Sequence, residues 1–148
     1  MRRMPGFAAI LSALFLFVGS LWAHEHKPPH KGTLVEFGEE FAHLELVLDA
    51  KEGQLTAYAL DGEAENAVRL SQKDIQIKIV GSDKPLTLKG IASPLSGEKE
   101  GDTSQFEVVD EQLKGKTNFD GLVIAINIKG KDFKDVKFNF PKGNEDAK

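Results

Sequence analysis

Apolar and polar residues alternate with a period of two along most of the chain after residue 32. Leucines recur at every second position within 42–49, and isoleucines do so within 74–80 and 122–128. This period is typical of β-strands whose two faces meet different environments. On this basis we expect strands at 33–37, 42–49, 54–60, 74–80, 86–91, 105–109, 122–128 and 133–140, with a short edge strand at 67–70.

Glycine, proline and charged residues separate these segments, and none of the segments shows a sustained helical period. The stretch 110–119 fits either a helical turn or an irregular connection. Eight or nine short strands at near-regular spacing are typical of an antiparallel sandwich or barrel. Because no pattern indicates a ligand cavity, we expect an all-β, immunoglobulin-like antiparallel β-sandwich. In its strongest strand we expect Leu122, Ile124, Ile126 and Ile128 to share one face.

The start of the chain has a different character. Two arginines precede an uncharged, apolar stretch at 7–18, and a less apolar segment at 19–23 follows it. This is the layout of a cleavable secretory signal peptide, which we expect to be helical. A membrane-spanning helix needs about 20 apolar residues, more than this stretch provides. Small residues before the cut permit cleavage after Ala23, which we favour, or after Ser20.

Cleavage after Ala23 divides the chain into four parts. These are a signal peptide at 1–23, a histidine-rich flexible tail at 24–32, a single β-sandwich domain at 33–140 and a polar C-terminal tail at 141–148. The length of the third part suits one domain. We expect the exported protein to be periplasmic or secreted.

The composition of the chain limits the classes of partner that we expect it to bind. The chain has no cysteine and a formal net charge of −4, which becomes more negative once the arginines of the signal peptide leave. An acidic protein lacks the basic face that nucleic acids require, and it is poorly suited to an anionic membrane surface. Without cysteine there is no disulfide, thiolate metal site or cysteine nucleophile. Stability must therefore come from the core.

The histidines are the most informative residues. The chain has four, all near the start of the expected mature protein: His24, His26, His30 and His43. Histidine is the commonest protein metal ligand, and clustered histidines often bind metal. We therefore treat all four as candidate ligands for Cu(II), Ni(II) or Zn(II), and we expect no other cofactor.

The position of the signal cleavage decides whether the most specific metal site, a chelate at the new amino terminus, can form. A cut after Ala23 gives an amino terminus that reads His24, Glu25, His26. Its amine, two backbone amides and the third-position imidazole can surround a square-planar ion, which favours Cu(II) or Ni(II). A cut after Ser20 removes this chelate, and His30 could add a further imidazole in either case.

A simpler interpretation of the same histidines also exists. Polar tails often contain histidine without binding metal, and the start of the mature chain could serve only to keep it soluble. His43 alternates with the leucines of its strand and is two residues from Glu45. We expect both side chains on the outward face, with His43 solvated.

Catalytic signatures are absent from the sequence. It holds no G-x-S-x-G, no phosphate-binding glycine loop and no H-E-x-x-H. Histidines confined to the start leave few ways to build a Ser-His-Asp arrangement. We therefore predict no catalytic residues and a non-enzymatic protein.

Three stretches, 30–38, 42–47 and 55–61, carry a family resemblance. Their pattern is H-x-G, E-x-G, H-x-E-L-V and a strand that ends in aromatic-x-L-D. It resembles small periplasmic proteins, and accessory segments of heavy-metal efflux adaptors, of Gram-negative, planctomycete-like bacteria. The resemblance implies a periplasmic location and a link to copper or other transition metals, with His30 and His43 matching the family's histidines.

A second comparison is with copper-carrying periplasmic β-sandwich proteins whose mature chain begins with histidine. The chain departs from them because no histidine follows His43 to complete their site. The sequence thus leaves two hypotheses. In the first, the protein is an exported metal-binding accessory whose partners are a metal ion and an envelope or efflux-system protein. In the second, it is a structural or protein-interaction β-domain without a metal role.

Overall fold

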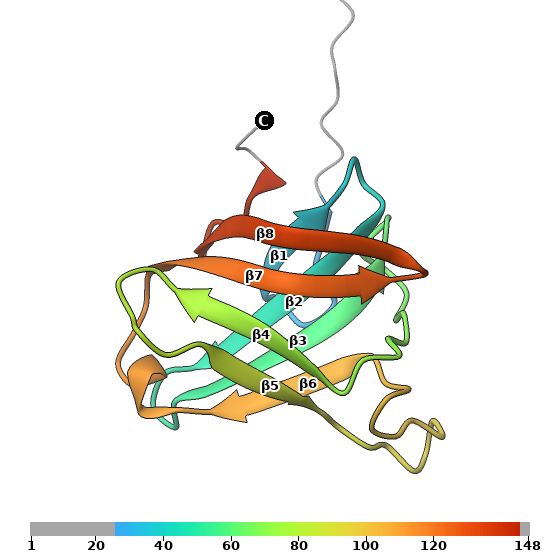
Figure 1. The fold of residues 1–148 in the computed structure, drawn as a ribbon, viewed down its shortest axis with the longest axis horizontal. Coiled ribbons are helices and arrows are strands. Elements are labelled where there is room, and N and C mark those ends of the chain that lie inside the picture. The colour runs from blue at the N-terminus through green and yellow to red at the C-terminus, as the bar shows by residue number, and fades with distance from the viewer. Residues whose placement is uncertain (1–25, 146–148) are drawn as a thin grey trace, which may run out of the picture.

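The computed structural model describes residues 26–145, and the signal peptide predicted at 1–23 lies outside this range. The described chain is all-β, as predicted, with eight antiparallel strands and one turn of 3-10 helix (Figure 1). The strands are β1 (Thr33–Phe37), β2 (Ala42–Asp49), β3 (Gln54–Asp61), β4 (Asp74–Ile79), β5 (Leu86–Gly90), β6 (Gln105–Val109), β7 (Phe119–Ile128) and β8 (Lys131–Phe140).

All eight strands belong to one sheet, in the order β1-β2-β3-β6-β5-β4-β7-β8. The sheet curls so far that its first and last strands, β1 and β8, contact each other without pairing as a ladder (Figure 1). The layout therefore differs from two separate immunoglobulin-like sheets, because a single hydrogen-bonded sheet encloses the core. The 3-10 turn at Glu111–Leu113 corresponds to the helical-turn alternative for 110–119.

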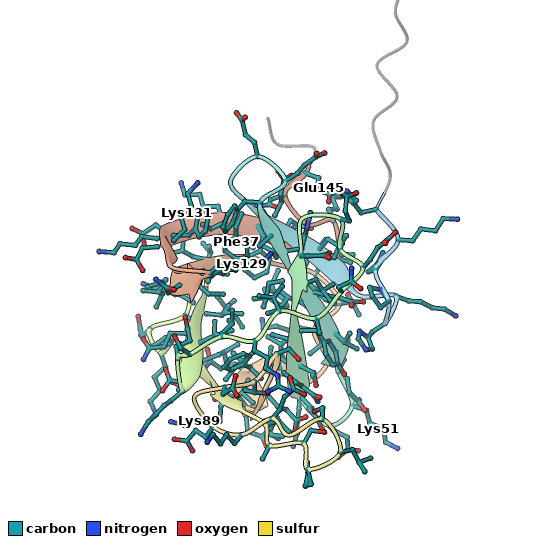
Figure 2. All side chains as sticks on the ribbon, turned by 90° about the vertical axis from the view of Figure 1, so that its right-hand side faces the viewer. Phe37, Lys51, Lys89, Lys129, Lys131 and Glu145 are labelled. Atoms are coloured by element: carbon teal, nitrogen blue, oxygen red, sulfur yellow. The ribbon has the colours of Figure 1, made fainter. Side chains whose placement is uncertain are left out.

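The core lies on the inner face of this curled sheet, where side chains fill the enclosed space (Figure 2). The leucines of β2 and the isoleucines of β4 point inward, as their alternation predicts. The largest side chains in this core that are completely buried include Phe37 and Phe106.

The expectation that Leu122, Ile124, Ile126 and Ile128 share one face was wrong in the first half of β7. Val123 is buried there, whereas Leu122 and Ile124 are partly exposed. The cause is a β-bulge: Ile77 pairs with Val123 and the preceding residue pairs with Ala125, so Ile124 is the extra residue of β7. One extra residue reverses the alternation of side chains, and Ile126 and Ile128 resume the inward face.

Strands β1 and β2 are unusual because their outer face is buried as well. Every residue of β1 is buried, and so are the first five of β2. Leu34, Leu60 and Ala64 form a second, small apolar cluster on this outer side. Residues 26–32 and 141–145, at the two ends of the described chain, also pack there, as their contacts below show. No helical segment within residues 26–145 is long and apolar enough to cross a membrane.

Candidate metal centre

The centre of the candidate site is His43, on the outer face of β2. In the ladder it lies opposite Glu36 of β1 and Leu60 of β3, and its side chain is completely buried. The alternation therefore predicted the correct face, but the expected solvation of His43 was wrong. The prediction failed because the face is covered by chain segments that are distant in sequence.

The His43 ring is fixed by one hydrogen bond. Its Nδ1 lies 3.1 Å from the backbone carbonyl oxygen of Asp61, so Nδ1 carries the proton and donates it. In the neutral form of the ring, Nε2 then has a free lone pair. A histidine that donates one ring N–H to a backbone carbonyl and offers the other nitrogen is the usual arrangement of a metal ligand.

The Nε2 atom of His43 has a close neighbour but no hydrogen bond. It is 3.2 Å from Oε1 of Glu145, a distance that qualifies as an ion pair. The directions of the two groups do not meet hydrogen-bond geometry, and Nε2 is a buried polar atom without a hydrogen-bond partner. The bond to Asp61 leaves Nε2 as the ring nitrogen that can face a metal ion beside this carboxylate.

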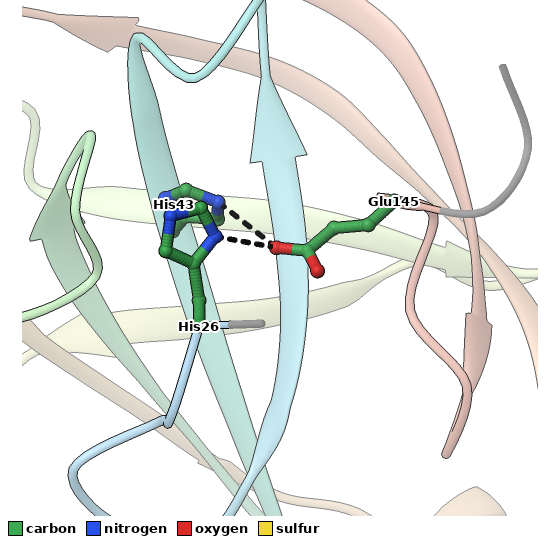
Figure 3. A group of neighbouring side chains, drawn as sticks. All are labelled: His26, His43 and Glu145. Carbon is green, nitrogen blue, oxygen red and sulfur yellow. Dashed lines mark hydrogen bonds and ion pairs between the residues drawn. The ribbon is translucent and has the colours of Figure 1, made fainter. Parts of the chain in front are cut away.

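His26 completes the group. Its Nδ1 is 3.2 Å from the same Oε1 atom of Glu145, and its ring packs edge-on against that of His43 with centroids 4.9 Å apart. Figure 3 shows the two imidazoles converging on one carboxylate oxygen from the same side. The three candidate ligand atoms all lie within 4.8 Å of one another.

Glu145 reaches this position because the chain after β8 turns back along β1. The side-chain amide of Asn144 accepts the backbone N–H of Glu36 at 2.7 Å and donates to its carbonyl at 3.1 Å. This pair of bonds imitates one rung of a β-ladder. Gly143 passes so close to β1 that a Cβ there would overlap the carbonyl oxygen of Leu34. Residues 143–144 thus close part of the gap between β1 and β8 and place the next side chain beside His43.

His26 is held in place by a second contact further along its segment. The Glu45 carboxylate is completely buried on β2 and accepts the backbone N–H groups of His30 at 2.8 Å and Gly32 at 2.9 Å. Its other oxygen lies 2.8 Å from Nδ1 of His30, whose ring stacks on Tyr58 with centroids 3.7 Å apart. Burial, then the negative charges of Glu45 and Glu107, raise the pKa of Tyr58, so this ring remains neutral.

The four histidines predicted from the sequence therefore separate. His26 and His43 come together, His30 is paired with Glu45, and His24 lies outside the described residues. Sequence reasoning missed Glu145, which it left in a polar tail. No local pattern distinguishes this residue from the other acids of the chain, because only the folded path of residues 141–145 brings it to the histidines.

The donor set fits a transition metal ion. Two imidazole nitrogens and one carboxylate oxygen suit Zn(II), Cu(II) or Ni(II), whereas Ca(II) and Mg(II) prefer six or more oxygens. Comparison of the chain with models of protein families, with curated proteins and with solved structures returned no match. The resemblance to efflux-associated periplasmic proteins thus stays a prediction. Fold and site together define a small all-β domain with a candidate two-histidine, one-glutamate centre.

Proposed function

We propose that this protein is an exported, non-enzymatic accessory that binds one divalent transition metal ion through His26, His43 and Glu145. The sequence hypothesis of metal binding by N-terminal histidines is kept, with a narrower ligand set. His30 acts in this proposal as an anchor for its segment and not as a ligand.

One observation carries the proposal: the Nε2 atom of His43 is completely buried and has no hydrogen-bond partner. A buried polar atom without a partner costs about 1 to 3 kcal/mol. A metal ion at this nitrogen would remove that cost, and it would also neutralise the carboxylate that faces the two rings. The bond from Nδ1 to Asp61 supports this role, because it fixes the lone pair in the direction of the group.

The amino-terminal Cu(II) or Ni(II) chelate would compete with this site, because both need the imidazole of His26. In that chelate the His26 imidazole closes a ring through Nδ1, the atom that contacts Glu145 here. The Nδ1 atom of His26 has one lone pair, so it can bind an ion in the amino-terminal chelate or in the group with His43 and Glu145, but not in both at once. We therefore expect one ion per chain even when the mature protein starts at His24.

A structural role without metal is the second candidate. The His26–Glu145 contact joins residues 119 positions apart, and Asn144 fastens the same end to β1. Such contacts could serve only to hold the two ends of the chain on the outer face of the sheet.

Metal titration of the exported protein distinguishes the two candidates. After mass spectrometry has read its first residue, the protein is titrated calorimetrically with Zn(II), Cu(II) and Ni(II). We expect one ion per chain, with binding weakened at least tenfold by Glu145→Gln, a change at a partly exposed side chain near the chain end. Glu52→Gln, the same change at an exposed residue of the turn between β2 and β3, is the matched control and should retain the ion. Absence of binding in the unmodified protein, or equal loss in both variants, would overturn the proposal.

A further inference from the structure

We infer that the ion held here is a four-coordinate Zn(II), and that its fourth ligand is a donor from outside the chain. This inference rests on the proposed function and deepens it, because it names the metal, its geometry and the chemistry of what binds to it.

Two of the distances between the candidate ligand atoms are close to those of a tetrahedral site. Nδ1 of His26 and Nε2 of His43 are each 3.2 Å from Oε1 of Glu145. With metal–ligand bonds of about 2.0 to 2.1 Å, ligand atoms of a tetrahedral site are about 3.3 to 3.4 Å apart, whereas neighbouring corners of a square are about 2.8 to 3.0 Å apart. Without an ion, 3.2 Å is also an ordinary distance between an imidazole and a carboxylate, so the choice of Zn(II) rests on the donor set. Two histidines and one glutamate are the protein ligands of known catalytic zinc sites, which keep a fourth position open.

The kinds of donor present among residues 26–145 also bear on the identity of the metal and of its fourth ligand. The chain has no cysteine, and its two methionines are Met1 and Met4, so residues 26–145 contain no sulfur ligand for Cu(I). Two neutral imidazoles and one carboxylate leave a bound divalent ion with a net charge of about +1. A positive centre that is partly enclosed by protein favours an anionic fourth ligand.

The neighbouring acids are engaged elsewhere. Glu36, opposite His43, accepts the backbone N–H of Glu40 through Oε1 at 2.8 Å. The Asp61 carboxylate accepts the side-chain amide of Asn66 at 2.7 Å, together with two backbone N–H groups. Among the described residues, the metal-ligating group therefore has three members. Structural zinc sites are closed by four protein ligands, and sites with three keep a position for water or another ligand.

The site also has an accessible side. The side chain of His43 is completely buried and that of His26 is 9% exposed, but that of Glu145 is 33% exposed. An incoming ligand can therefore approach from the side of the carboxylate. The geometry points to a small, monodentate anionic donor as the fourth ligand, and such an exchangeable position is what a protein that accepts and releases zinc requires.

Substitution with Co(II) tests this inference, because Co(II) takes the place of Zn(II) and its visible spectrum reports coordination number. The exported protein is loaded with Co(II), its spectrum is recorded, and azide is then titrated in. We expect intense visible bands, typical of four-coordinate Co(II), which shift in a saturable manner as azide replaces the fourth ligand. Zn(II) should abolish the bands by competition. Glu145→Gln should weaken them, while Glu52→Gln, the same change at an exposed residue of the turn between β2 and β3, should leave both spectrum and azide response unchanged.

Each adverse outcome has a separate meaning. If neither Co(II) nor Zn(II) binds, the proposed function itself fails. If Co(II) binds with only the faint bands of six-coordination, metal binding stands and the four-coordinate inference is overturned. If intense bands do not respond to azide at any concentration, the open fourth position is overturned, because the protein then supplies four ligands itself.

Discussion

His43 illustrates, at the scale of single residues, what a sequence can and cannot show. The alternation within β2 assigns its side chain to the outer face, together with Glu45. It does not show that segments from both ends of the described chain cover that face. The burial of His43 depends on contacts with residues 17 positions earlier and 102 positions later, and no local pattern encodes such contacts. Buried imidazole and carboxylate groups in one strand were therefore mistaken for a solvated face.

Gly32 offers a test of how the segment that carries His26 is held. A Cβ at this position would lie 2.6 Å from the carbonyl oxygen of Leu46 and 2.8 Å from Cγ of Glu45. Both atoms belong to the sheet, so we expect Gly32→Ala to push the segment away. It should destabilise the protein by about 1 to 3 kcal/mol, a range typical of overpacking.

The measurement is urea unfolding followed by zinc titration of the folded variant. Zinc affinity should fall together with stability, because His26 precedes the displaced residue in the same segment. Lys27→Ala is the control, since Lys27 is exposed and lies next to His26. A Gly32→Ala protein with unchanged stability and zinc affinity would show that the segment does not need this close packing.

At the scale of the elements, periodicity located all eight strands but not their partners. The edge strand expected at 67–70 was wrong, because only isolated bridges form there, at Ala67 and Leu70. Adjacent hairpins such as β1–β2 and β7–β8 follow from short connections. The pairing of β3 with β6 does not, because the chain between them forms two other strands. The bulge in β7 was also invisible, since an extra residue changes the register without any change in residue type. The contact of β1 with β8, which closes the fold, is a consequence of these long-range pairings.

Asn144 links this closure to the candidate site. Its amide makes both bonds to the Glu36 backbone, and it directly precedes Glu145. In Asn144→Asp a carboxylate oxygen would face the Glu36 carbonyl in place of the donating NH2 group. We expect Asn144→Asp to lower zinc affinity by about 10- to 100-fold, as loss of a residue that orients a ligand does.

Calorimetric titration with Zn(II) measures this effect. Asn118→Asp is the matched control, because the side-chain oxygen at position 118 only needs to accept from Asn139 and an aspartate can still accept. Equal zinc affinity in Asn144→Asp and the unmodified protein would mean that the hydrogen bonds of the Asn144 side-chain amide do not position Glu145.

For the molecule as a whole, metal binding and stability should be coupled. The ligands come from both ends of the described chain, so an ion bound to His26, His43 and Glu145 would join those ends across the outer face of the sheet. A ligand that binds only the folded state stabilises it by about 2.7 kcal/mol at 100 times its dissociation constant. For a domain of this size that corresponds to a rise in Tm of roughly 10 °C.

Thermal unfolding with added Zn(II), and again after EDTA, checks this coupling. The rise should be reversed by EDTA and largely absent in Glu145→Gln, whereas the control Glu52→Gln should show the full rise. A Tm that does not depend on zinc in the unmodified protein would favour the purely structural role of the two chain ends.

Anomalous diffraction at the zinc absorption edge is the most direct test of the central claim. Crystals of the exported protein, grown with one equivalent of Zn(II), should show one strong anomalous peak, about 2.0 to 2.2 Å from His26 Nδ1, His43 Nε2 and a carboxylate oxygen of Glu145. Zinc found only elsewhere, or no peak between these three side chains although the ion is present, would contradict the account.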